Sequence, residues 1–422
     1  MSIGIRNGGR RLPKPQTFVA FGYRNYRLWF VGQLVSLLGT WMQMTAQGYL
    51  VYQLTHSKAY LGYVAFAAGL PIWVFMLYGG VVADRMSRRK LMVMTQTGMM
   101  LLAFALAALT FANLVRPAHI LGLAFLLGIA NAFDAPARQS FVLELVERHH
   151  LANAIALNST MFNAGTAVGP AVAGFAYAAF GPGWCFLLNG ASFIAVIAAL
   201  MAMKIETPVS SAPRRPVYTE MLEGLRYVRG HAIIRSVIAL VGCASLFAMG
   251  LFTLLPAWAV DILHGDARTL GFMQSARGVG ALAGALTLAS ISAYPRKGRL
   301  LTTGAFAFPV MLIAFSFTRH APPALATLLG MGMAQILTLN MANVIVQTKV
   351  SDSLRGRVMG VYTQIFFGVM PIGGLLAGGV GDRLGAPSAF LVGGLGLLAC
   401  VVLLWTVQRD LVSVTDEAAR LA

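Results

Sequence analysis

The chain is short of charged residues. Only 11% of its 422 residues are Asp, Glu, Lys or Arg, whereas about a quarter is usual in soluble domains. Apolar residues make up 58% of the sequence. A helix that crosses a membrane needs about 20 apolar residues, so a chain of this length has room for a dozen. The composition excludes a disordered or collagen-like protein and argues strongly against a soluble cytosolic enzyme.

Residues that carry chemistry are also scarce. The three cysteines, Cys185, Cys243 and Cys400, have no Cys or His partner at metal-ligand spacing, which excludes a zinc site and a disulfide framework. The seven histidines fall in loops or at the ends of apolar runs, and the sequence has no Ser-His-Asp set, HExxH motif or phosphate-binding Gly-Lys-Ser loop. We therefore expect no enzyme activity, no cofactor and no metal. The driving force must then be an ion gradient, with protons as the expected ion.

Long runs without charge alternate with short charged loops. The run 151–203 is too long for one helix, and Gly181-Pro182-Gly183 divides it in two. The stretch 269–295 is interrupted only by Arg277. These segments predict an all-α membrane protein of twelve transmembrane helices, together with the runs 28–57, 59–83, 91–115, 117–133, 236–260, 300–318, 321–348, 358–381 and 384–408.

The basic residues lie on alternate loops. If both termini are cytoplasmic, most of the 32 Lys and Arg residues fall on the cytoplasmic side, as the positive-inside rule requires. The net charge of +18 is then spread beside anionic lipid headgroups. A nucleic-acid-binding protein would instead gather it on one folded face. We expect membrane lipids as neighbours and no nucleic-acid partner.

The sequence contains an internal repeat. Residues 146–200 align without a gap on residues 350–404, so that Gly169 meets Gly373 and Gly181 meets Gly385. Two similar six-helix halves are typical of a transporter whose central site opens alternately to each side. Residues 217–230, between the halves, are predicted to form a short amphipathic helix on the membrane surface. The predicted units are a basic cytoplasmic tail (1–26), an N-terminal bundle (27–204), a cytoplasmic linker (205–235), a C-terminal bundle (236–408) and a cytoplasmic tail (409–422).

The loop after the second span carries a motif. It contains Gly80, Asp84, Arg85, Arg88 and Arg89, and it resembles the signature G-x-x-x-D-R-x-G-R-R of the major facilitator superfamily, with Ser87 in place of a glycine. An Asp at the end of one helix can cap the positive N-terminus of another. The resemblance implies that Asp84 ties span 2 to the start of span 11, near residues 353–357, and steadies one conformer. The alternative is a set of basic membrane anchors with an incidental Asp.

Span 5 carries a second motif. Gly165, Gly169, Pro170 and Gly174 resemble the G-x-x-x-G-P-x-x-G-G element that the superfamily associates with exporters. Small residues four apart let helices approach closely, so ordinary helix packing is the alternative interpretation. The stretch 131–139 is similar to the bacterial branch that contains the enterobactin exporter and the transmembrane secretion effectors. The resemblance covers nearly the whole chain. It implies two pseudo-symmetric six-helix bundles, a monomer, and a place in the bacterial inner membrane with both termini cytoplasmic.

Two charged residues are expected inside the membrane. Arg277 in span 8 costs at least ~2.5 kcal/mol on insertion scales. It is a candidate cavity cation that binds an anionic or polar substrate together with Gln274, and the alternative is an Arg that snorkels or pairs with carbonyls at a helix contact. Asn131, Asp134 and Arg138 share one face of span 4. Asp134 is the candidate proton carrier, and the alternatives are an ion pair with Arg138 or with the arginines of the loop motif.

Amides complete the candidate site. Spans 1, 4, 7 and 10 line the cavity in the superfamily, which makes Gln43, Gln47, Asn340 and Asn343 candidate wall residues, although an amide in a helix can equally join two helices. The set indicates a large cavity for an amphiphilic molecule. The sequence therefore predicts a secondary active transporter that exports a siderophore-like or drug-like small molecule in exchange for protons. The alternatives are an importer, a lysolipid flippase, or a membrane sensor or scaffold that transports nothing.

Overall fold

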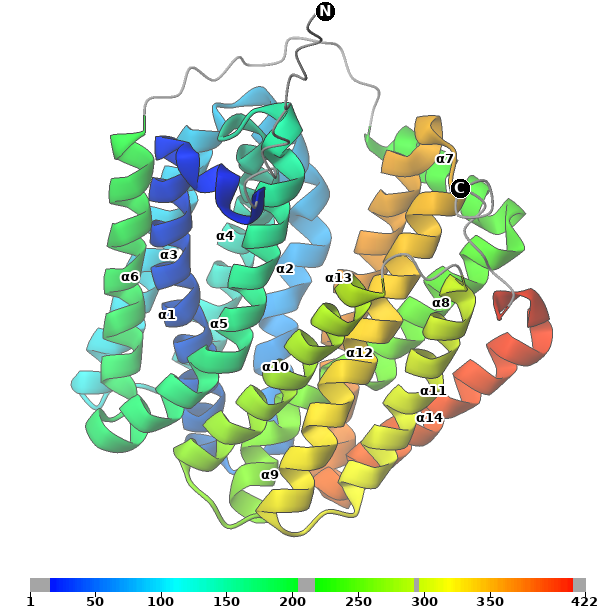
Figure 1. Ribbon diagram of the computed structural model, residues 1–422. Helices are drawn as coiled ribbons and strands as arrows, with labels where there is room; N and C mark the ends of the chain where they lie inside the picture. The colour runs from blue at the N-terminus through cyan, green and yellow to red at the C-terminus, as the bar shows by residue number, and fades with distance from the viewer. Residues whose placement is uncertain (1–15, 204–216, 292–295, 413–422) are drawn as a thin grey trace, which may run out of the picture.

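The computed structural model describes residues 16–203, 217–291 and 296–412, and over these ranges the chain is helical with no strand. Two groups of helices stand side by side (Figure 1). The N-terminal bundle contains α1 (Arg24–Thr55), α2 (Lys58–Arg85), α3 (Arg88–Phe111), α4 (Pro117–Phe141), α5 (Leu151–Phe180) and α6 (Pro182–Ala202), with the short helices η1 (Gln16–Gly22), η2 (Val142–Glu144) and η3 (Arg148–His150). The C-terminal bundle contains α8 (Ala232–Phe247), η4 (Met249–Leu254), α9 (Leu255–Asp261), α10 (Ala267–Ser290), α11 (Lys297–Ser316), α12 (Ala321–Lys349), α13 (Asp352–Leu384) and α14 (Ala386–Val407), followed by η5 (Arg409–Leu411).

The predicted all-α membrane fold is confirmed. Within the described ranges, nine helical segments are long and apolar enough to cross a membrane, with α8, η4 and α9 counted as one. The three further long helices, α1, α5 and α10, are not among them. These helices carry many of the polar side chains of the candidate site. The count of twelve spans stays a prediction.

Two helices begin inside the predicted flanking units. The helix α8 begins at Ala232, inside the predicted linker 205–235, and α1 begins at Arg24, inside the predicted tail. Residues 1–15 of that tail, 204–216 of the linker and 413–422 of the C-terminal tail lie outside the described residues. The predicted amphipathic helix is present as α7 (Val217–Gly230) and packs on the start of α13. In Figure 1 it lies at the top, on what we call the linker face; the other end of the bundles is the opposite face.

The predicted span 236–260 is not one continuous helix. The backbone breaks at Ala248, with φ −121° and ψ −52°, and continues as the tighter helix η4. The cause lies in the packing against α13. A Cβ atom added to Gly250 would lie only 2.2 Å from the carbonyl carbon of Gly373, so the break brings two backbones into direct contact. The pattern of apolar residues in the sequence does not show such a break, because the residues before and after it are both buried and apolar.

The internal repeat is visible in the backbone. The helices α5 and α6 meet at Gly181, and α13 and α14 meet at Gly385. These two glycines have almost the same positive φ, 84° and 85°, which L side chains rarely adopt. Equivalent positions of the repeat thus form equivalent corners.

Two helix pairs join the bundles, and they too are equivalent. The helix α2 packs on α13, and α10 packs on α5; we call these contacts the α2/α13 seam and the α5/α10 seam. A Cβ on Gly62 would meet the carbonyl oxygen of Gly374 at 2.7 Å, and a Cβ on Gly271 would meet that of Pro170 at 2.5 Å. Gly374 and Pro170 are repeat-related, as are Gly62 and Gly271. Each bundle therefore offers the same two surfaces to the other.

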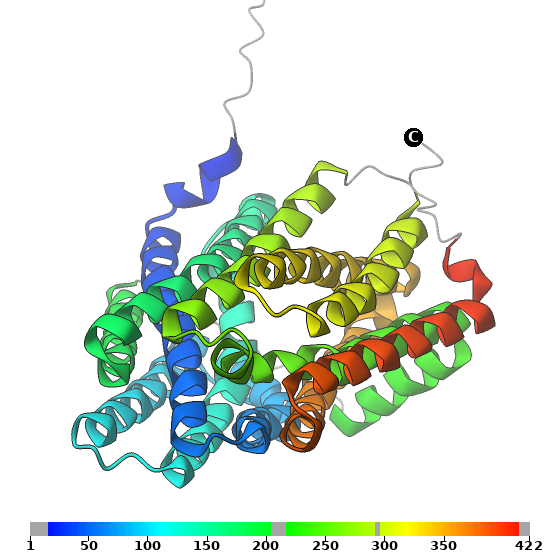
Figure 2. The same ribbon diagram turned by 90° about the horizontal axis from the view of Figure 1, so that it is seen from below.

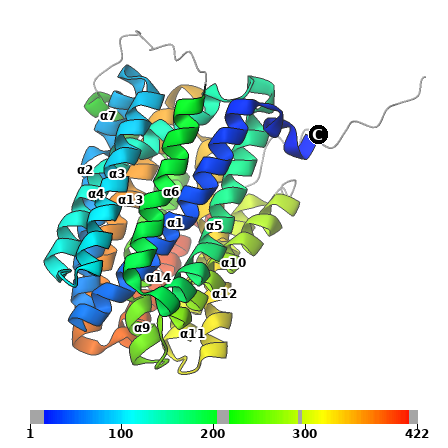
Figure 3. The same cartoon turned by 90° about the vertical axis from the view of Figure 1, so that its left-hand side faces the viewer.

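The cross-bundle contacts lie from mid-depth to the opposite face. Halfway along α2, the Trp73 carbonyl oxygen accepts a hydrogen bond from Gln364 Nε2 at 2.8 Å. On the other seam, Gly278 packs on the backbone of Thr166 near the middle of α5. Figure 2 shows the molecule from the opposite face, and Figure 3 shows the N-terminal bundle from its outer side. The described contacts hold the bundles together over the half away from the linker.

Candidate substrate site and gate

Arg277 lies in the middle of α10, about 15 Å from the nearer helix end. Its Nη1 donates a hydrogen bond to Gln335 Oε1 of α12 at 3.2 Å, and its Cζ lies 4.4 Å from the ring centre of Phe252 in η4. Its Nε is buried without a hydrogen-bond partner. Among the described residues no carboxylate forms a salt bridge with it. A neutral amide and an aromatic face hold this cation, and neither neutralises its charge.

Gln274 places this group beside the boundary between the bundles. Its Oε1 accepts a hydrogen bond from Thr45 Oγ1 of α1 at 2.7 Å. Because Gln274 lies one helical turn before Arg277, the arginine is close to a polar contact between the two halves. Gln47, two residues after Thr45, is half-buried. Gln274 and Arg277 thus lie next to α1 of the other bundle, and the central site itself stays a prediction.

Gln43 lies elsewhere. Its side chain is 6% exposed, and its Oε1 accepts a hydrogen bond from Asn189 Nδ2 of α6 at 2.7 Å. Both residues belong to the N-terminal bundle, so the structure favours the alternative in which this amide joins two helices. The helical period of the sequence did not predict this contact. Apolar residues occupy most sides of α1, so the sequence does not show which neighbouring helix Gln43 faces.

The remaining amides bond locally. Asn131 Nδ2 donates to the Leu127 carbonyl oxygen at 2.9 Å, within α4. Asn343 Oδ1 accepts from Gln347 Nε2 at 2.6 Å, within α12, and Asn340 of the same helix is exposed. Asn131 lies on α4, whereas Asn340 and Asn343 lie on α12, and these side chains do not meet in this conformation.

Asp134 is buried in the N-terminal bundle, with 1% of its surface exposed. Its Oδ1 accepts hydrogen bonds from Thr95 Oγ1 at 2.9 Å and Gln96 Nε2 at 3.0 Å, both on α3. Its Oδ2 lies 3.5 Å from Arg138 Nε. Both carboxylate oxygens are therefore engaged, which favours the predicted ion pair with Arg138 over the pairs with Arg85 or Arg88.

Three contacts of the loop motif lie within its own bundle. Asp84 lies 3.8 Å from Arg88, whose Nη1 also contacts Glu144 at 2.5 Å. Arg89 Nη2 donates to the Met201 carbonyl oxygen at 2.9 Å, while Arg85 is exposed and a Cβ on Gly80 would meet nothing. The expected partner region, at the start of α13, has its Arg357 paired with Glu223 of α7 at 2.6 Å. The bond from Asp84 to span 11 stays a prediction.

The span 5 motif divides into two parts. Gly165 and Gly169 face Trp41 of α1, with an added Cβ on Gly169 only 2.6 Å from the Trp41 Cβ. Pro170 and Gly174 lie in the α5/α10 seam, where a Cβ on Gly174 would meet the Ala267 carbonyl oxygen at 2.6 Å. One motif thus serves both packing inside a bundle and contact between bundles.

A charged cluster at the opposite face was not predicted. Lys58 and Tyr52 of the N-terminal bundle meet Asp261 of α9, and Asp382 of α13 contacts the start of α2. These residues lie at helix ends more than a hundred residues apart, where the sequence shows only ordinary loop charges.

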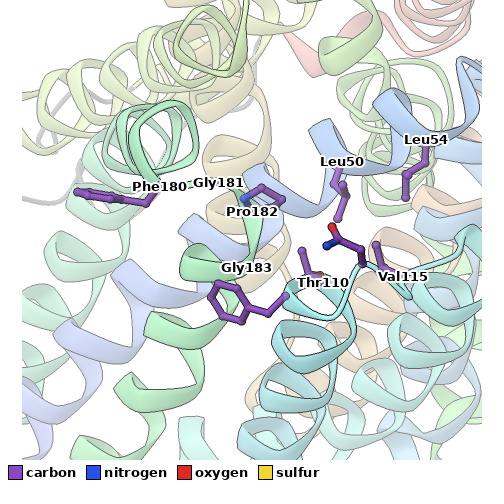
Figure 4. Close-up of a pocket in the computed structure, with 10 residues that line it drawn as sticks. Leu50, Leu54, Thr110, Val115, Phe180, Gly181, Pro182 and Gly183 are labelled. Carbon is purple, nitrogen blue, oxygen red and sulfur yellow. The ribbon is translucent and has the colours of Figure 1, made fainter.

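A pocket of about 380 Å³ also lies at this end, but it belongs to the N-terminal bundle alone. Leu50 and Leu54 of α1, Thr110 and the α5–α6 corner line it (Figure 4). It contains none of the predicted site residues and is separate from the polar group around Arg277.

Comparisons with known proteins agree with this architecture. A family model described as transmembrane secretion effector matches residues 16–421. The multidrug efflux pump Tap of Mycolicibacterium fortuitum is 28% identical over 380 residues, which cover 86% of this chain and 91% of Tap. The staphyloferrin A transporter of Staphylococcus aureus is 23% identical over 395 residues (93% and 98% covered), and the enterobactin exporter EntS of Escherichia coli is 26% identical over 393 residues (92% of both).

Solved structures show the same fold. The nucleoside transporter NupG superposes with a TM-score of 0.71 at 13% identity, covering 91% of this chain and 98% of NupG. A POT family transporter superposes with a TM-score of 0.74 at 10% identity, covering 92% and 97%. With a family match over nearly its whole length, the chain belongs to the transmembrane secretion effector family of the major facilitator superfamily, whose members are membrane transporters and not enzymes.

Proposed function

We propose that this transporter exports an amphiphilic small molecule, such as a siderophore or a drug, in exchange for protons by alternating access across the bacterial inner membrane. The relatives carry names of exporters or transporters of such molecules. The observation that carries the proposal is the polar group beside the boundary between the two bundles, in which Arg277 has no counter-charge among the described residues and Gln274 bonds across to Thr45.

Arg277 is the proposed binding group for an anionic or polar part of the substrate. A cation held inside a membrane protein without a carboxylate is costly, and an anionic ligand would relieve this cost. The adjacent Phe252 and Gln335 would restrict the position of the guanidinium. Two repeat-related bundles whose described contacts occupy one half of their length suit a rocking motion that exposes this group alternately to each side.

Asp134 is the proposed proton carrier, because it is the one carboxylate found in the interior of a described membrane-length helix. Its bonds to α3 and to Arg138 mean that a proton must displace Arg138 from Oδ2. Arg138 is 37% exposed, so it can turn towards solvent when this happens. Binding and release of a proton at Asp134 would then be linked to movement of α4, the helix that carries both Asp134 and Arg138.

Transport into everted vesicles tests the proposal. An anionic amphiphilic dye should accumulate when the vesicle interior is made acidic, and its entry should dissipate the pH gradient. Arg277→Gln should reduce the initial rate at least about tenfold for the anionic dye, whereas Arg268→Gln, an exposed arginine on the same helix, should not. Asp134→Asn should leave a residual dye flux that no longer dissipates the gradient.

Other outcomes would support the alternative functions. Dye accumulation only in right-side-out vesicles would indicate an importer, and transfer of lysolipid between leaflets would indicate a flippase. If neither dye, siderophore nor lysolipid moves, and Arg277→Gln changes nothing, the chain is a sensor or scaffold and the proposal is wrong.

A further inference from the structure

The charged cluster at the opposite face joins the two bundles, and its role rests on the proposed alternating access. Asp382, at the end of α13, accepts hydrogen bonds at Oδ1 from the backbone N–H of Lys58 at 2.9 Å and of Ala59 at 3.4 Å, and from Ser57 Oγ at 3.3 Å. The first N–H groups of a helix have no partner within it. A carboxylate of the C-terminal bundle therefore caps a helix of the N-terminal bundle, where the helix dipole also favours a negative charge.

An ion pair crosses between the bundles beside this cap. Lys58 Nζ lies 2.7 Å from Asp261 Oδ2, and Tyr52 Oη donates to the same carboxylate at 2.6 Å. The side chains of Lys58 and Asp261 are 16% and 32% exposed, so water screens the pair only in part. The other charged or titratable groups nearby are His56, whose ring contacts Tyr52, and Arg383, next to Asp382. We call Asp382, Asp261, Lys58 and Tyr52 the latch.

The repeat-related seam has no equivalent of this cap. At the start of α10, Asp266 accepts from the N–H groups of Arg268 at 3.0 Å and Thr269 at 3.1 Å, and so caps its own helix. The residue that aligns with Asp382 on α5 is Ala178, which has no side-chain acceptor. At this end the α5/α10 seam has a contact between Phe175 and Phe272, with ring centres 5.6 Å apart, and Arg268 above Phe175.

We infer that the latch sets the proportion of molecules closed at the opposite face, and that it does so through the α2/α13 seam alone. Two seams with the same glycine packing thus differ in their polar contacts, because only the α2/α13 seam has a carboxylate cap and an ion pair that cross between the bundles. Opening the opposite face takes Asp382 away from the first turn of α2, which keeps only its own Ser57 cap, and separates Lys58 from Asp261. The first turn of α10 keeps its Asp266 cap. Removing the latch should therefore favour the form that is open at the opposite face without damaging either bundle.

Distances between spin labels on the two bundles measure this equilibrium in nanodiscs. The labels are placed at Leu54→Cys and Leu384→Cys, which are 41% and 64% exposed, in a background with Cys185, Cys243 and Cys400 replaced by Ala. Asp382→Ala should raise the ratio of long to short distances about two- to thirty-fold, the range expected for loss of a helix cap. The matched control is Asp266→Ala, which removes a cap of the same kind from the repeat-related helix.

A second comparison uses the ion pair. Lys58→Glu should also raise the long-distance population, and adding Asp261→Lys to it should bring the population back towards that of the parent. Thermal unfolding of each variant shows that the bundles remain folded.

The inference is overturned if Asp382→Ala leaves the distances unchanged, if Asp266→Ala shifts them equally, or if the charge reversal gives no recovery. These measurements need no substrate. A transporter that moves no dye but responds to Asp382→Ala would refute the proposed function and leave the latch standing. Normal dye export with no response to Asp382→Ala would do the reverse.

Discussion

Replacing Gly271 by alanine tests whether backbone packing in the α5/α10 seam limits opening of the opposite face. The added Cβ would lie 2.5 Å from the carbonyl oxygen of Pro170 and 3.3 Å from the Cα of Ala171. The nearer of these is a backbone atom that cannot turn away, so the seam must widen. Overpacking of this kind costs about 1–3 kcal/mol.

A second effect acts in the other direction. Alanine is about 1 kcal/mol more favourable than glycine within a helix. This gain applies whether the seam is closed or open, whereas the overpacking cost applies only to the closed form. Gly271→Ala should therefore leave the unfolding temperature nearly unchanged but raise the ratio of open to closed molecules by a factor of about 5 to 160.

Spin labels at Phe180→Cys and Phe317→Cys, which are 68% and 67% exposed, report on this seam from the two bundles. Gly98→Ala is the control, since a Cβ at Gly98 of α3 would meet nothing within 4 Å. If Gly271→Ala shows the same distances as the parent protein, or if Gly98→Ala shifts them as much, the idea that glycine contacts hold the seam closed is wrong.

Three further predictions concern other polar contacts. Gln43→Ala should lower stability by about 1–3 kcal/mol in thermal unfolding, because it leaves the buried Asn189 amide without its partner, and it should not alter the order of preference among dyes; a changed preference would return Gln43 to the cavity wall. Asp134→Asn should lower the unfolding temperature, and the addition of Arg138→Gln should recover part of the loss if the pair acts as a unit; strictly additive losses would contradict this. Glu223→Gln should change stability by less than about 1 kcal/mol, because its pair with Arg357 is partly exposed, and a larger drop would show that α7 is needed for folding of the C-terminal bundle.

Much of the fold followed from the distribution of charge. Runs without charge located the helices, and Gly181-Pro182-Gly183 located the corner between α5 and α6, because a left-handed backbone needs glycine there. Gly385, which aligns with Gly181, forms the second corner with nearly the same backbone angle. The break in α8–η4–α9 could not be read in the same way, since it results from contact between Gly250 and a helix more than a hundred residues later.

The candidate site was predictable only in part. A lone arginine in an apolar run is conspicuous, and Arg277 does lie among polar side chains next to the other bundle. The amides were harder to place, because an apolar sequence gives no sign of which neighbour a glutamine faces; Gln43 turned towards Asn189. The latch was missed because its carboxylates lie in the last turns of two helices, where charges are expected for solubility in any case.

The two mid-depth contacts have a geometric consequence. Gln364 meets Trp73 on one side of the molecule, and Gly278 meets Thr166 on the other. A line through these two contacts would be the rotation axis if one bundle tilts against the other as a rigid body, and atoms near this axis would move least. Arg277 precedes Gly278 in the chain and so lies close to this axis. A tilt would therefore change which aqueous compartment reaches its guanidinium, while the group itself would move very little.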